Sequence, residues 1–256
     1  MDTVFGLFRV EPDAAPDATH LHLDIRQTHD DSGWTFTAFE QPIYSIQHER
    51  QIVPATESLV THLFTRLQRS LFVLHTGLVE WNGHGILIPG ERGSGKSTLT
   101  LWLARNGARY FGDDLILFDF QAERVIAFPK AATLKQGSFP CYEEAPTYED
   151  PVRGPVRYFL PESAGLHDMP LANLKLIVFP QYIAVGAKPS HELSEGWSAL
   201  ALVQQLFGGF DWDDRGLSLI ARLSKIPARV LPYSDLHQAQ RQITEALETE
   251  APHALS

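Results

Sequence analysis

A glycine-rich run near the middle of the chain constrains the fold more than any other feature. The run is Gly90-Glu91-Arg92-Gly93-Ser94-Gly95-Lys96-Ser97, which matches the pattern G-x-x-x-x-G-K-[ST]. In this pattern the glycines let backbone N–H groups approach phosphate closely, the lysine supplies a fixed cation, and the hydroxyl can hold a metal ion. The sequence therefore predicts a phosphate-binding loop between a strand and a helix. The residues expected around a bound nucleotide are Gly90, Glu91, Arg92, Gly93, Ser94, Gly95, Lys96, Ser97 and Thr98.

The segments on either side of this loop fit that requirement. Two apolar runs, 77–81 and 85–89, flank Asn82-Gly83, and Asn-Gly is the strongest short-range signal for a β-hairpin. The second strand of the hairpin leads directly into the glycines. Residues 97–106 are rich in Leu and Ala and are followed by Gly107, which is typical of a helix and its C-cap. We expect a strand, a glycine loop and a helix in this order.

An acidic pair, Asp113-Asp114, follows this helix at the end of the next short strand. In many phosphate-binding-loop proteins the magnesium-holding Asp comes much later in the chain. Here the early pair predicts two carboxylates beside the γ-phosphate, one to hold Mg²⁺ and one to orient or deprotonate an attacking hydroxyl. The alternative is a polar turn between two strands.

Taken together, these motifs resemble the kinase domain of HPr serine kinase/phosphorylase. The resemblance rests on Leu74-His75-Thr76-Gly77-Leu78-Val79, the hairpin, residues 90–98 and Arg109-Tyr110-Phe111-Gly112-Asp113-Asp114. The later Phe128-Pro129-Lys130 and Thr133-Leu134-Lys135 resemble HPr-kinase-related proteins of peptide pathways, including the lasso-peptide kinases.

The resemblance implies an α/β P-loop kinase domain of the HPr kinase and phosphoenolpyruvate carboxykinase type, with a mixed sheet and flanking helices. It implies transfer of the ATP γ-phosphoryl group to a serine hydroxyl, or less often a threonine hydroxyl. By position, Asp113 would be the catalytic base, Asp114 and Ser97 would hold Mg²⁺, and Lys96 would stabilise the phosphates. His75 would lie near the phosphates or the base, although a lone His is more often structural.

The chain as a whole predicts two parts. Residues 1–55 contain short β-like runs at 20–25, 34–39 and 43–46, and residues 56–256 form the expected catalytic domain, beginning with an amphipathic helix at 57–71. Residues 137–170 are rich in Pro, Gly, Glu and Tyr, which predicts long loops or lids. We see no room for the separate N-terminal domain of the HPr enzymes, so we do not expect HPr itself to be the substrate.

Four basic residues are weaker candidates for contacts with phosphate or substrate. Lys130 and Lys135 could neutralise phosphate, and Arg153 and Arg157 could clamp a transition state or bind the acceptor. Solvated surface positions are the alternative for each of the four.

Composition and net charge limit the kinds of partner that we expect the chain to bind. A formal net charge of -10 argues against strong binding to nucleic acid or to anionic membranes. The single cysteine excludes an intrachain disulfide, and the N-terminus shows no signal peptide, so we expect a cytoplasmic protein. The expected ligands are ATP and Mg²⁺, and the expected partner is an acceptor peptide or small protein. Homo-oligomerisation stays open.

Two other functions remain open from the sequence. The same site could phosphorylate a small-molecule alcohol, because the loop and the metal are indifferent to what carries the hydroxyl. Alternatively, the chain could be a non-catalytic scaffold that binds ATP and then recruits a partner. Asp113 argues against a scaffold, because a nucleotide sensor needs no base.

Overall fold

The computed structural model divides the chain into two compact units, which are described separately. One unit comprises residues 1–64 and 133–159, and the other comprises 65–132 and 160–256. Each unit is thus discontinuous in sequence, whereas the predicted division at residue 55 assumed continuous parts. The structure describes residues 23–28, 32–38, 40–67, 71–142, 145–186, 188–206 and 214–250.

The first unit contains a three-stranded antiparallel sheet, β1 (Leu23–Gln27), β2 (Trp34–Ala38) and β3 (Gln41–Ile46). The predicted strands at 34–39 and 43–46 correspond to β2 and β3, while part of the predicted run at 20–25 lies outside the described residues. Phe36, Ile46 and Ala55 form a small buried core. The helix α2 (Ile52–Leu67) begins five residues before the predicted Glu57, since a proline is tolerated in the first turn of a helix.

Residues 137–170 are not the long loops that the sequence predicted. A short 3₁₀ helix, η4 (Gln136–Cys141), is followed by the hairpin β11 (Thr147–Asp150) and β12 (Gly154–Phe159), and β12 also pairs with β10 (Ala132–Lys135). Asp150 closes the hairpin turn, because its Oδ1 accepts hydrogen bonds from the backbone N–H groups of Val152 and Arg153 at 2.8 and 2.6 Å. The prediction of long loops was therefore wrong for 147–150 and 154–159.

The second unit contains a six-stranded mixed sheet in the order β15-β16-β14-β6-β5-β7. Strands β6, β14 and β16 are parallel to one another, whereas β5, β7 and β15 pair antiparallel with their neighbours. The parallel strands therefore end at the same edge of the sheet. The strands are β5 (Thr76–Trp81), β6 (His84–Pro89), β7 (Arg109–Gly112), β14 (Leu174–Tyr182), β15 (His191–Leu193) and β16 (Ala228–Tyr233).

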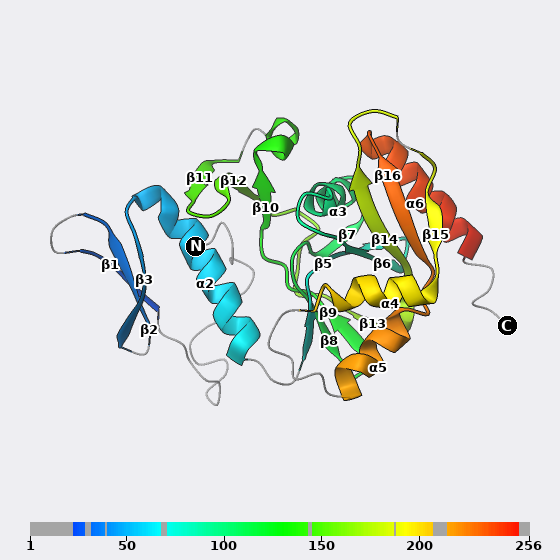
Figure 1. The fold of residues 1–256 in the computed structure, drawn as a ribbon, viewed down its shortest axis with the longest axis horizontal. Helices are drawn as coiled ribbons and strands as arrows, with labels where there is room; N and C mark the ends of the chain where they lie inside the picture. The colour runs from blue at the N-terminus through cyan, green and yellow to red at the C-terminus, as the bar shows by residue number, and fades with distance from the viewer. Residues whose placement is uncertain are drawn as a thin grey trace. The chain divides into compact units, whose positions relative to one another are not determined.

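Helices α3 (Lys96–Arg105) and α6 (Leu236–Glu250) cover one face of this sheet (Figure 1). Alternate residues of each strand lie on opposite faces of the sheet, because successive side chains of a strand point in opposite directions. Ile86 and Val178 pack toward α3 and α6, whereas Leu87 and Ile177 pack into the opposite core.

That opposite core is closed by a four-stranded antiparallel sheet and two helices. The sheet order is β13-β9-β8-β4, and residues of the helices pack against the same cluster. These elements are β4 (Phe72–Leu74), β8 (Ile116–Asp119), β9 (Arg124–Ile126), β13 (Asp168–Pro170), α4 (Glu195–Val203) and α5 (Asp214–Leu223). The result is a mixed α/β unit, in agreement with the predicted fold class at this level.

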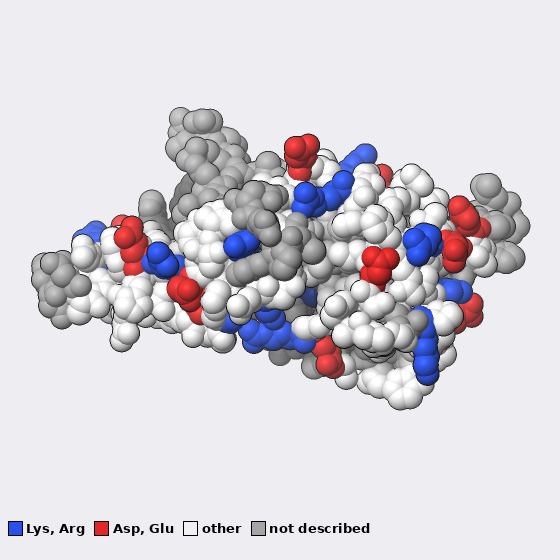
Figure 2. Space-filling view, turned by 90° about the horizontal axis from the view of Figure 1, so that it is seen from above, with Lys and Arg blue, Asp and Glu red and all other residues white. Residues whose placement is uncertain are grey.

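Figure 2 shows Lys and Arg side chains scattered among Asp, Glu and neutral residues on the face that it draws. Within the part of the chain that the structure describes, no helix combines the length and the apolar character needed to cross a membrane.

Candidate functional site

The glycine loop follows the hairpin as predicted. Asn82 and Gly83 both have positive φ, 52° and 81°, which is the requirement of a type I′ turn between β5 and β6. Strand β6 then ends at Pro89, and α3 begins at Lys96. Gly107, with φ of 108°, follows the helix, in the C-cap region that the sequence indicated.

The loop itself depends on glycine at two kinds of position. Gly95 precedes α3 with φ of 93°, a left-handed conformation that other residues rarely adopt. Gly90 allows close approach, since a Cβ there would lie 2.6 Å from the Ser94 Oγ. That hydroxyl is buried and makes no hydrogen bond within the described residues, so it can donate to a ligand oxygen.

Tyr233, at the end of β16, holds the last glycine of the loop. Its hydroxyl donates to the backbone oxygen of Gly95 at 3.2 Å, and a Cβ on Gly95 would lie 2.0 Å from that hydroxyl oxygen. Gly95 is therefore constrained twice, by its own φ and by the tyrosine.

We expect Gly95→Ala to destabilise the second unit by about 1–2 kcal/mol from the left-handed conformation alone, and by more because of the clash with Tyr233. Urea unfolding monitored by circular dichroism would measure the change. The double variant Gly95→Ala/Tyr233→Phe removes the hydroxyl and should regain part of the loss. If the double variant were no more stable than the single one, the clash would not be the cause.

Lys96 joins the loop to the acidic pair. The residue is 7% exposed, and its Nζ donates to the backbone oxygen of Asp113 at 2.5 Å. Thr100, one turn later, bonds its hydroxyl to the Lys96 backbone oxygen at 2.9 Å and sits against Gly77 of β5, where a Cβ would lie 2.3 Å from it. The helix that carries Lys96 is thus packed closely onto the sheet.

Asp114 lies at the centre of a group of charged side chains. Its Oδ1 is 2.8 Å from Nε2 of His75, and its Oδ2 is 3.4 Å from Nζ of Lys130. Burial opposes the charged form of Asp114, but Lys130, His75 and Lys96 together hold its pKa well below the usual range. Asp114 is therefore a carboxylate at neutral pH.

Asp113 has different surroundings. It is 2% exposed, and its Oδ1 accepts a hydrogen bond from the Tyr110 hydroxyl at 3.2 Å. The same hydroxyl lies 3.2 Å from the backbone oxygen of Lys130. Burial, and next the nearby Asp113 charge, raise the pKa of Tyr110 well above its usual value. Tyr110 is thus a neutral donor. We call Lys96, Asp113, Asp114, His75, Lys130 and Tyr110 the Asp114 cluster.

The low pKa of Asp114 predicts a specific acid sensitivity. A group whose pKa is depressed in the folded state contributes stability above its unfolded pKa of about 3.9, and this contribution is lost as pH falls through the folded pKa. We expect Asp114→Asn to lower the free energy of unfolding at pH 7 by about 3 kcal/mol, because the buried charge of Lys130 loses its ion pair with Asp114.

The same variant should reduce the dependence of stability on pH below 4. Urea unfolding at pH 7 and at steps between pH 5 and 2 would measure both effects. An unchanged acid limb in Asp114→Asn would mean that other groups control it.

The structure brings His75, Lys96, Asp113, Asp114 and Lys130 together, all within the second unit. Ser97 and Thr98 lie half-buried in the first turn of α3, and Glu91, Arg92 and Gly93 are exposed in the loop. Lys130 is not the solvated surface lysine that the sequence left open as the alternative, because it is 1% exposed. Tyr110 lies in the run 109–114 that carries the resemblance, but it was not predicted as a site residue.

The other three basic candidates belong to the first unit, whereas the Asp114 cluster belongs to the second. Arg153 pairs with the buried Glu57 at 3.1 Å and with Asp150 at 3.6 Å. Arg157 donates to the Thr147 hydroxyl and to the backbone oxygen of Tyr142, both at 3.0 Å. Lys135 is half-buried at the end of β10. Substrate roles for these three residues stay predictions.

The cluster fits a magnesium ion bound together with phosphate. Mg²⁺ is usually held by one or two protein oxygen ligands and completes its shell with water and phosphate oxygens. Asp114 is ionised and 22% exposed, and Lys96 ties the start of α3, next to Ser97, to the acidic pair. Among the described residues, no group of three or more His, Cys, Asp or Glu side chains is arranged to hold a metal ion.

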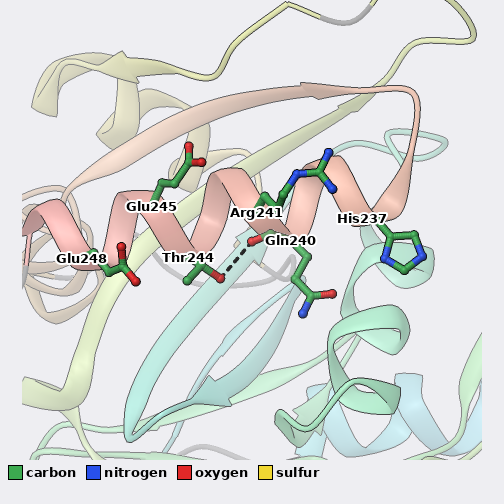
Figure 3. Close-up of a pocket in the computed structure, with 6 residues that line it drawn as sticks. All are labelled: His237, Gln240, Arg241, Thr244, Glu245 and Glu248. Atoms are coloured by element: carbon green, nitrogen blue, oxygen red, sulfur yellow. Dashed lines mark hydrogen bonds between the residues drawn. The ribbon is translucent and has the colours of Figure 1, made fainter.

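A separate hollow of about 370 Å³ lies along α6 (Figure 3). All its lining side chains come from that one helix, and none belongs to the Asp114 cluster. Gln240 accepts a hydrogen bond from the Trp102 indole at 3.1 Å, and the His237 ring packs against the same indole. The hollow has mixed charge and no convergent set of donors. Its lining residues are His237, Gln240, Arg241, Thr244, Glu245 and Glu248.

Comparison with known proteins leaves the family of this chain open. No protein-family model matches it, and no curated protein matches it. Among solved structures, the chain is similar to the Hpr(Ser) kinase/phosphatase from Coxiella burnetii, with a TM-score of 0.32 and 13% sequence identity. The similarity covers 70% of this chain and 95% of that chain. At these values neither the fold nor the activity of that enzyme is transferred to this chain.

Proposed function

We propose that this protein is an ATP-dependent and Mg²⁺-dependent kinase that transfers the γ-phosphoryl group to a serine, or less often a threonine, hydroxyl of a peptide or small protein. One observation carries the proposal: the loop lysine, Lys96, reaches the backbone of Asp113 at 2.5 Å. The loop lysine therefore lies next to residues 113 and 114, close enough for its charge to lower the pKa of Asp114. Phosphoryl transfer needs little more than such positioning and charge stabilisation.

The two carboxylates divide their roles according to their surroundings. A carboxylate whose pKa is held well below the usual range accepts protons poorly at neutral pH, which favours Asp114 for the metal. Asp113 is left as the group that accepts the acceptor's hydroxyl proton. Because Asp113 is 2% exposed, the acceptor approaches past the more exposed Asp114. His75 orients Asp114 through its hydrogen bond.

The glycine loop would bind ATP, the phosphate donor. Backbone N–H groups of residues 90–95 and the start of α3 bind the phosphates, and Lys96 neutralises the β and γ oxygens. Ser97 and Asp114 would hold Mg²⁺, which, when bound, neutralises charge on the β and γ phosphates and fixes their orientation. A ligand oxygen would also give the buried Ser94 hydroxyl its missing partner.

Transfer to a range of acceptors separates this proposal from its two alternatives. The protein would be incubated with Mg²⁺, γ-labelled ATP and either serine peptides, matched alanine peptides or small alcohols, and products would be read by mass. A gain of one phosphate on serine peptides alone is expected. A phosphorylated alcohol would indicate a metabolite kinase, and ATP binding with no product would indicate a scaffold.

A further inference from the structure

We propose that Tyr182 is the platform on which the base of the nucleotide stacks. Because of this contact, the site binds purine nucleoside triphosphates more tightly than polyphosphate that carries no base. The inference rests on the proposed function, because it extends the same site from the phosphates to the base. The glycine motif of the sequence reads phosphate and carries no information about the base.

The platform lies at the edge of the sheet where a ligand is expected. Strands β6, β14 and β16 are parallel, so their carboxyl ends lie together, and ligands of α/β sheets bind outside those ends. Strand β6 leads into the glycine loop, and the next strand, β14, ends at Tyr182. The residue opposite Tyr182 on β16 is Tyr233.

Backbone hydrogen bonds fix Tyr182 to the loop itself. Its N–H donates to the Ser94 backbone oxygen at 3.1 Å, and the N–H of Ile183 donates to the Tyr233 backbone oxygen at 2.8 Å. Its Cβ lies 3.5 Å from the position that a Cβ of Gly95 would occupy. The tyrosine is therefore beside the start of α3, next to the expected phosphate position.

The ring of Tyr182 is held on one side and open on the other. Tyr233, which is 2% exposed, meets it edge-on, with ring centroids 5.7 Å apart and an interplanar angle of 65°. Yet 58% of Tyr182 remains exposed. An aromatic ring that is anchored and open is the arrangement on which a nucleobase stacks, and every base offers a π-face to it.

The structural alternative is that Tyr182 only braces the loop. Two ligands distinguish the roles: ATP carries a base, and inorganic tripolyphosphate carries the same phosphates without one. A bracing residue would affect both ligands equally, whereas a platform would affect ATP alone.

Equilibrium binding by titration calorimetry, with Mg²⁺ present, would compare ATP, CTP and tripolyphosphate on the wild-type chain and on Tyr182→Ala and Tyr182→Phe. Removal of a stacked aromatic costs roughly 5- to 150-fold in affinity. We expect Tyr182→Ala to lose ATP affinity by that factor and to keep its tripolyphosphate affinity, while Tyr182→Phe keeps both. The wild-type chain should prefer ATP over CTP, because a purine presents the larger face.

Val185→Ala is the matched control, because Val185 lies in the same connection, is 85% exposed and has no place in the platform. Equal losses for ATP and tripolyphosphate in Tyr182→Ala, or no loss for either, would overturn the platform. ATP binding that depends on Tyr182 without any transfer to an acceptor would support the platform and overturn the kinase. A wild-type chain that binds neither ligand would overturn both.

Discussion

Asp113→Asn is expected to reduce phosphoryl transfer by about 10²- to 10⁴-fold, the usual contribution of a general base, while ATP binding changes little. The asparagine is nearly isosteric, and it keeps an oxygen that can accept the Tyr110 hydrogen bond now made to Oδ1. The loss would therefore come from the missing proton acceptor rather than from unfolding. Phosphoryl transfer would be measured as the initial rate with a peptide identified as an acceptor. ATP affinity would be measured by titration of the same samples.

Asp114→Asn gives the contrasting pattern. Because we assign Asp114 to the metal, this variant should raise the Mg²⁺ concentration needed for half-maximal transfer, and extra Mg²⁺ should restore part of the rate. Asp168→Asn, which changes an aspartate with a side chain 55% exposed on β13, is the matched control and should behave like the wild type.

For the first variant, Asp113→Asn, a rate of phosphoryl transfer equal to that of the wild type would show that Asp113 is not the base.

Lys96→Met is expected to lower transfer by about 10²- to 10³-fold and to weaken binding of ATP and of tripolyphosphate alike. The methionine fills similar space but brings no charge to the β and γ phosphates. It also leaves the Asp113 backbone oxygen without the donor it now has, which costs about 1–3 kcal/mol of stability.

Two controls separate these effects of Lys96→Met. Unfolding curves define a temperature at which both proteins are folded, and rates and affinities are compared there. Lys225→Met changes an exposed lysine of the same unit and should leave transfer and binding unchanged. If Lys96→Met bound ATP as tightly as the wild-type chain, residues 90–97 would not be the phosphate site.

Local sequence signals predicted the hairpin, the glycine loop and the helix that follows it, because the geometry of these elements is local. Asn82-Gly83 demands positive φ at both positions, and the loop glycines have the same kind of requirement. The early position of Asp113 and Asp114 after one helix also predicted them near the loop. The helix leads away from the loop, and strand β7, which runs parallel to β6, returns the chain to the same edge of the sheet. The contact between Lys96 and Asp113 follows from this.

The ion pair of Asp114 with Lys130 could not be predicted, because it depends on packing between segments that are distant in the sequence. Lys130 lies buried beside Asp114 in the irregular segment between β9 and β10, and no pattern in Phe128-Pro129-Lys130 signals that approach. Tyr110 reaches Asp113 around the bend at Gly112. Tyr182 and Tyr233 become neighbours of the loop only when three parallel strands align.

The hairpin of β11 and β12 was missed for a different reason. Strand β11 is short and polar and shows no alternation of burial, and β12, whose buried residues do alternate, begins with Gly and Pro, which are more typical of loops. Its turn uses the Asp150 side chain to bind two backbone N–H groups in place of an Asn-Gly pair. Residues 147–150 and 154–159 are therefore strands where the sequence predicted loops.

Transfer of label from ATP tests the central claim most directly. The wild-type chain would be incubated with Mg²⁺ and a serine peptide, once with ATP labelled at the γ-phosphate and once with ATP labelled at the α-phosphate, and the peptide would be isolated. The proposed kinase predicts label on the serine peptide from the γ-labelled ATP alone, dependent on Mg²⁺ and absent when alanine replaces the serine. A panel of serine peptides would be tested at ATP concentrations at which the protein binds ATP. If no peptide of the panel became labelled, the kinase would be contradicted.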